Sequence, residues 1–151
     1  MKKVVSLILV FLILILSGCT AKEPPVPAGL SAEDTVKLYF KYWNEMDSNG
    51  MNSLFISEHQ LSDFDFFDKL EGNSVTLVSA VLDESKSGKV SQTVFDESFG
   101  TYNEEAFVNT KYTTTNKNNS DYTGDNIIIN WQFRLIKNDS SNWVIVDFGS
   151  G

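Results

Sequence analysis

The sequence predicts one α+β domain in which helices near its start pack on a mainly antiparallel sheet. Two patterns indicate this fold. From residue 36 to residue 46, apolar side chains recur every three or four positions, the period of a helix with one buried face. After Gly72, β-branched and aromatic residues dominate, as is typical of strands. Helical segments followed by a run of strands favour an α+β roll of four to five strands, curved into a cone around the first helix.

The first helix is expected to begin after Ser31, whose side chain can accept a hydrogen bond from a free amide, with Glu33 and Asp34 in the first turn. Asn49-Gly50 predicts its end. Its buried face is formed by the apolar positions Val36, Tyr39, Phe40, Trp43 and Met46. Shorter amphipathic patterns predict two further helices, at residues 51–57 and 61–70.

Four strands are expected at residues 74–82, 106–114, 126–136 and 142–148, with an additional strand at 90–95. The third is the clearest, because apolar and polar residues alternate from Ile127 to Leu135. Turn-forming residues at 138–141 predict a hairpin between the last two strands, and the polar segment 116–125 is expected to be a loop.

Residues 1–18 have the layout of a secretory signal: Lys2 and Lys3 precede an apolar run at residues 4–16. Thirteen residues form a helix of about 20 Å, too short for a hydrocarbon layer of roughly 30 Å. Leu16-Ser17-Gly18-Cys19 follows and resembles the lipobox of bacterial lipoproteins. This resemblance implies cleavage before Cys19, lipidation of that cysteine, and anchoring on the outer side of the cell membrane. The alternative is that Cys19 is an ordinary apolar residue of an uncleaved segment.

Residues 19–30 are expected to form a tether that holds all three prolines, and residues 31–151 the domain. Cys19 is the only cysteine, so the domain has no internal disulfide. Removing Lys2 and Lys3 from the 12 basic residues leaves 10 against 20 acidic ones, a net charge of about −10. Such a charge argues against nucleic acid as a partner and either attracts cationic partners or serves solubility.

Two segments, SAEDTVKLYFKYWNEMD at residues 31–47 and WQFRLIKNDSSNWVIVDFGSG at residues 131–151, carry a wider resemblance. They are similar to an uncharacterised family of Gram-positive lipoproteins with a nuclear-transport-factor-2-like, or cystatin-like, domain. The resemblance implies a cone-shaped fold and export, and it carries no assigned reaction.

In such a cone, the first helix and the concave sheet face would bound a pocket for an apolar or sugar-like ligand. Its expected lining is aromatic: Tyr39, Trp43, Trp131, Phe133 and Trp143. The same side chains are equally what the core of this fold requires, and core filling is the favoured interpretation.

An enzymatic alternative resembles ketosteroid isomerase, whose chemistry needs a carboxylate base and a hydrogen-bond donor for an oxyanion. Asp147 shares a strand face with Trp143 and Ile145 if the strand is regular, so it is the candidate base, and Tyr39 or Tyr112 the candidate donor. This would suit an isomerase or dehydratase. The position of Asp147 beside Gly149 at a strand end favours a turn contact instead.

No metal site or cofactor is expected, because the single histidine, His59, lacks the partners of a zinc site or a catalytic triad. The favoured function is therefore a non-catalytic binding or protein-interaction domain on a lipid anchor. Its expected partner is an envelope protein or a small extracellular, apolar ligand, and a homodimer through the sheet stays open. The alternatives are the small-molecule enzyme and a structural accessory lipoprotein.

Overall fold

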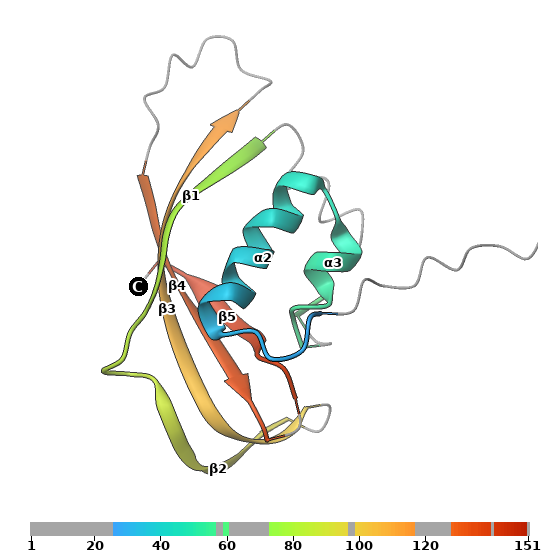
Figure 1. The fold of residues 1–151 in the computed structure, drawn as a ribbon, viewed down its shortest axis with the longest axis vertical. Helices are drawn as coiled ribbons and strands as arrows, with labels where there is room; N and C mark the ends of the chain where they lie inside the picture. Colours follow the sequence, from blue (N-terminus) through green and yellow to red (C-terminus); the bar gives the residue numbers. More distant parts are fainter. Residues whose placement is uncertain are drawn as a thin grey trace, which may run out of the picture.

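The computed structural model describes residues 26–56, 59–60, 73–96, 99–116, 128–139 and 141–150. Two helices lie on one face of a five-stranded antiparallel sheet that bends around them, so that the face toward the helices is concave (Figure 1). The α+β prediction is confirmed. The elements are α2 (Ala32–Glu45), α3 (Ser48–Asn52), β1 (Asn73–Leu82), β2 (Gly88–Asp96), β3 (Gly100–Asn116), β4 (Ile128–Lys137) and β5 (Val144–Gly149).

The long strand β3 organises the sheet. Strands β1, β3, β4 and β5 are neighbours in that order, and β2 pairs with the first part of β3. All five expected strands are present. Strand β3 begins at Gly100, six residues before its expected start, because β2 and β4 supply backbone partners to residues 100–105, which lack an alternating apolar pattern.

Helix α2 begins as expected, with the Ser31 hydroxyl accepting a hydrogen bond from the Asp34 amide at 3.1 Å. The predicted end at Asn49-Gly50 is wrong. The helix stops at Glu45, because Met46 takes a left-handed conformation (φ 54°) and the Asp47 amide donates back to the Tyr42 carbonyl at 3.0 Å.

Asn49 and Gly50 instead lie inside α3, which Asp47 caps by accepting a hydrogen bond from the Gly50 amide at 2.9 Å. The helix expected at 51–57 is thus shifted toward the N-terminus. Beyond it, Phe55 pairs with Ile145, and the Leu54 carbonyl accepts from the Ile145 amide at 2.8 Å. This contact covers part of the outer edge of β5. The helix predicted at 61–70 lies outside the described residues. Residues 117–125 of the expected loop also lie outside them.

The main core lies between α2 and the concave face. The predicted face of α2 is buried at Val36, Tyr39, Phe40 and Trp43, none of them more than 6% exposed. From the sheet, Val108, Phe133, Leu135 and Ile145 are fully buried against it. A smaller cluster joins Ile56 and Tyr102 to Ile136 and Val146.

Asn44 joins α2 to the edge strand β1 by two hydrogen bonds. Its Nδ2 donates to the Val75 carbonyl at 2.7 Å, and its Oδ1 accepts from the Val75 amide at 2.9 Å. A backbone donor and acceptor that the edge of the sheet leaves without a ladder partner are thus satisfied by one amide side chain.

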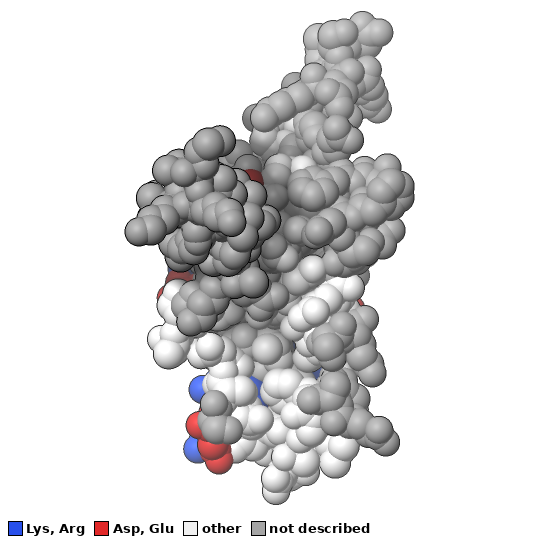
Figure 2. Space-filling view, turned by 90° about the vertical axis from the view of Figure 1, so that its right-hand side faces the viewer, with Lys and Arg blue, Asp and Glu red and all other residues white. Residues whose placement is uncertain are grey.

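Figure 2 views the molecule from the side of the two helices and shows few charged side chains on the described part of that surface. None of the helices that the structure describes is long and apolar enough to span a bilayer. Cys19 and the rest of the expected signal lie outside the described residues.

Candidate functional site

The aromatic residues expected to line a pocket are found mainly in one packed cluster. The Tyr39 ring lies 5.1 Å from that of Phe133 and 6.0 Å from that of Trp43, and the Trp131 and Phe133 rings are 6.3 Å apart. Edge-to-face and tilted contacts at these distances are those of a filled aromatic core. Trp143 packs at the margin of this core, where the Lys137 ammonium lies 5.1 Å from its ring centre.

The described residues form two surface grooves considered below, and neither is lined by Tyr39, Trp43 or Phe133. These three side chains fill the space between α2 and the sheet. Trp131 borders one groove and Trp143 the other. Ligand binding by the five aromatic residues stays a prediction, and the space around Tyr39, Trp43 and Phe133 is taken by packed side chains.

The two tyrosines proposed as oxyanion donors are both buried, Tyr39 at 4% and Tyr112 at 1% exposure. Burial disfavours the charged phenolate. It raises the pKa of Tyr112 to about 12, and it raises the pKa of Tyr39 further. Both are neutral hydrogen-bond donors over the whole physiological range.

Raising the pH from about 10 to about 12 is expected to lower the free energy of unfolding. Tyrosine in the unfolded chain ionises near pH 10, whereas Tyr39 and Tyr112 keep their protons in the folded protein. Between these pH values the folded state binds more protons than the unfolded state. The free energy of unfolding is therefore at its full value below pH 10 and declines as the pH rises. Denaturant titrations across this range measure the decline, and Tyr112→Phe should reduce it. Complete ionisation of all five tyrosines near pH 10 without unfolding would contradict this expectation.

Asp147 does not point inward, as the enzymatic alternative requires. Strand β5 has an irregularity: Asp147 pairs with Arg134 and Ile145 with Leu135, leaving Val146 as an extra residue. A bulge of this kind reverses the alternation that follows it. Asp147 is therefore exposed on the convex face, while Phe148 turns inward, its ring 5.7 Å from that of Tyr39. The carboxylate and the two tyrosines lie on opposite faces of the sheet, which separates the proposed base from its donors.

His59, the only histidine, is exposed after α3. Among the described residues there is no group of three or more histidine, cysteine, aspartate or glutamate side chains that could hold a metal ion.

A groove of about 580 Å³ opens on the convex face, opposite the helices. Val108 and Phe133 are buried toward α2, so their neighbours Asn109 and Gln132 point the other way. We call this the convex-face groove. Its lining comes from three adjacent strands and the turn after β1: Ser79, Val81, Asp83, Lys86, Asn109, Lys111, Asn130 and Gln132, with Thr110 and Trp131 between them.

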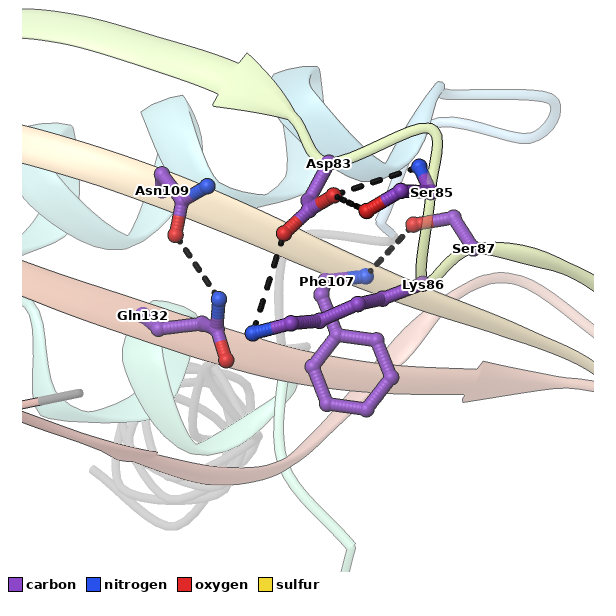
Figure 3. Close-up of polar contacts among 7 residues, drawn as sticks. All are labelled: Asp83, Ser85, Lys86, Ser87, Phe107, Asn109 and Gln132. Carbon is purple, nitrogen blue, oxygen red and sulfur yellow. Dashed lines mark hydrogen bonds and ion pairs between the residues drawn. The ribbon is translucent and has the colours of Figure 1, made fainter.

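Polar contacts order one side of this groove (Figure 3). Gln132 Nε2 donates to Asn109 Oδ1 at 2.8 Å across strands β3 and β4. The Lys86 ammonium lies 3.7 Å from an oxygen of Asp83 and 5.9 Å from the centre of the Phe107 ring. The stem of Lys86 thus lies along the sheet, with the side chain still 54% exposed.

Asp83 is held in the tight turn between β1 and β2. Its Oδ1 accepts from the Ser85 hydroxyl at 2.6 Å and from the Ser85 amide at 3.2 Å. These hydrogen bonds, with the nearby charge of Lys86, hold the pKa of Asp83 below its usual value. Asp83 is therefore an ionised acceptor that positions Lys86.

A second groove of about 330 Å³ lies at the start of α2, between Glu33, Glu84 and Trp143. Two more acids on its wall are already paired. Glu105 binds Arg134 at 2.5 Å, and Glu104 binds Lys137 at 3.4 Å. These ion pairs connect β3 to β4. The two acids therefore help to hold the sheet together and are not free to bind a ligand.

Apart from Trp131, the residues of the convex-face groove were not singled out from the sequence. On an alternating strand, Asn109 and Gln132 read as an ordinary solvated face, and only strand register places them together. A cluster of amides on neighbouring strands is the one available signal. No protein-family model, curated protein or solved structure matches this chain.

Proposed function

We propose that this protein is a lipid-anchored, extracytoplasmic lipoprotein whose domain binds its partner, without catalysis, through the convex-face groove. The observation that carries this proposal is the groove itself: an ordered row of hydrogen-bonding side chains on the sheet face opposite the main core. Side chains of this kind, held in place by their neighbours, provide orientation and specificity in binding sites.

The sequence supports the location. Lys2, Lys3, the apolar run and the Leu16-Ser17-Gly18-Cys19 segment suit export and lipidation, and two acyl chains give stable anchoring. The resemblance to Gram-positive lipoproteins with a nuclear-transport-factor-2-like domain supports the same location. The tether of residues 20–30 reaches at most about 34 Å at about 3.1 Å per residue, so the domain works close to the membrane surface.

The non-catalytic assignment is supported by the positions of the candidate catalytic groups. Asp147 is exposed on the convex face, whereas Tyr39 and Tyr112 are buried on the concave side. General-base catalysis requires the base and the oxyanion donor to reach one substrate, within hydrogen-bond distance of its reacting atoms. The opposite orientations disfavour the isomerase or dehydratase alternative.

Replacing Cys19 is expected to abolish lipid attachment and to release the protein from membranes, because no other thiol is available for the diacylglyceryl group. Cells fed labelled palmitate and then fractionated measure both effects. The matched control is Ser17→Ala, which keeps a small residue before the cysteine and should still be labelled. Label that still enters the Cys19→Ala variant would refute lipidation at this site.

A photoreactive residue tests the groove directly. Val81 borders the groove and is 59% exposed, while Val94 on β2 is 70% exposed outside it. With a photoreactive amino acid at position 81, irradiated cells should yield a crosslinked product that position 94 does not give. A shift in gel mobility of the purified protein detects a crosslinked protein partner, and mass spectrometry also detects a smaller one. Equal products at both positions, or none at either, would contradict a binding role for the groove and favour an accessory lipoprotein without a ligand there.

A further inference from the structure

The floor of the convex-face groove is formed by amide side chains. Asn109 on β3 lies beside Asn130 and Gln132 on β4, and the Asn109–Gln132 hydrogen bond uses one donor and one acceptor of the pair. Each amide group carries two donors and an oxygen with two lone pairs. Within the described residues, the side chains of Asn130 and Lys111 make no hydrogen bond or ion pair. The groove therefore presents several donors and acceptors to a ligand.

The charge of the groove differs from that of the chain. The whole chain carries a net charge of −8, yet the groove contains only the Asp83–Lys86 pair and Lys111. Asp83 and Lys86 largely neutralise each other at 3.7 Å. One remaining ammonium is too little for a phosphorylated ligand, which needs several cations or a helix N-terminus. The balance favours a neutral ligand that is rich in hydrogen-bonding groups.

The backbone beneath the groove is already used. Strand β3 pairs with β1 on one side and β4 on the other, so its amides and carbonyls are engaged in ladders. An extended peptide is normally recognised through free backbone groups at a sheet edge, and the centre of the groove has no such edge. Recognition there has to come from side chains.

Val81 adds an apolar element. It lies opposite Asn109 in the β1–β3 ladder and on the same face, 59% exposed. A sugar ring has hydroxyl groups around its rim and C–H bonds on its flat faces. Amides can bind adjacent hydroxyls while an aliphatic side chain covers a C–H face, so the groove and the ring share their pattern of polar and apolar groups.

We propose that the convex-face groove binds a neutral saccharide chain. This inference rests on the proposed binding function and names the class of its ligand. A volume of about 580 Å³ lies within the range of small-ligand sites, roughly 300–1,000 Å³, and gives room for a short oligosaccharide. Asn109, Asn130 and Gln132 bind the hydroxyl groups, Lys111 donates one further hydrogen bond, and Val81 contacts the ring.

Calorimetry on the full-length, lipidated protein in nanodiscs tests this proposal, with chito-, cello- and malto-oligosaccharides as the soluble probes. A second arm measures retention of the same protein on purified wall glycan from which the peptides have been removed. We expect saturable binding in at least one arm. Binding to the soluble probes points to free oligosaccharides as the source, and binding to the wall glycan alone points to the polymer.

Asn109→Ala and Gln132→Ala should each weaken the affinity about tenfold, the effect of losing one or two net hydrogen bonds. The matched control is Gln92→Ala, which removes an exposed amide on β2 outside the groove and should leave affinity unchanged. Both groove positions are on the solvent-facing side of their strands, and unchanged thermal unfolding of the variants confirms that they fold.

Absence of binding in both arms at about 10 mM sugar, above the range of weak affinities, would overturn the saccharide proposal. So would binding that Asn109→Ala and Gln132→Ala leave unchanged. If position 81 still crosslinks to a partner in cells while no saccharide binds, the saccharide inference fails and the proposed binding function stands. If position 81 gives no crosslink and no saccharide binds in either arm, the binding function itself fails.

Discussion

Phe133→Ala is expected to lower the free energy of unfolding by about 3–5 kcal/mol, the usual cost of removing a buried phenylalanine ring. Phe133 has no exposed surface, and four aromatic rings surround it at 5.1–6.3 Å: Tyr39, Phe40, Trp131 and Phe148. The loss is large because α2 and the two last strands meet at this ring. The four neighbouring rings cannot fill the cavity left by the substitution without moving a helix or a strand.

Urea denaturation of the purified protein measures this effect. Val94→Ala is the control, because Val94 is 70% exposed and its truncation should change the stability by less than about 0.5 kcal/mol. A similar, small loss in both variants would show that the aromatic cluster is not the centre of the core.

Gly50→Ala is expected to destabilise the protein by about 1–3 kcal/mol through overpacking. A Cβ at this position would lie 2.6 Å from Asp47 Oδ2 and 2.6 Å from Cδ1 of Tyr42, well inside contact distance. Tyr42 is only 6% exposed, and the Asp47 carboxylate is the N-cap of α3. Relief of the clash therefore displaces a buried ring or breaks the cap.

Gly149→Ala is the matched control, since a Cβ there meets nothing within 4 Å and the residue does not have a positive φ. Thermal unfolding of the two variants should give a clearly lower Tm for Gly50→Ala and a nearly unchanged Tm for Gly149→Ala. Equal Tm values would mean that the turn between α2 and α3 tolerates a side chain at position 50.

The helix face and the strands are the features that could be predicted, because each follows from a local period. Val36, Tyr39, Phe40 and Trp43 share one side of any helix that contains them. The end of α2 was missed for a related reason. Asn49-Gly50 is a common helix-ending pair, yet Met46 ends the helix first, and Asp47 begins a new one.

Strand β5 shows where local reasoning stops. A regular alternation from Trp143 puts Asp147 on the inner face, and that assumption produced the catalytic hypothesis. The extra residue Val146 exists only in relation to β4, so its effect on Asp147 cannot be read from the segment alone.

By itself, the sequence determined the α+β class, the buried face of the first helix and the locations of the strands, because these depend on periods within one segment. The tertiary structure alone decided the bulge at Val146, the filled aromatic core and the convex-face groove. The physical reason is register: Asn109 meets Gln132 only through hydrogen bonds between strands that are distant in the chain. A shift of one residue in either strand would turn that strand's side chain to the opposite face and separate the pair.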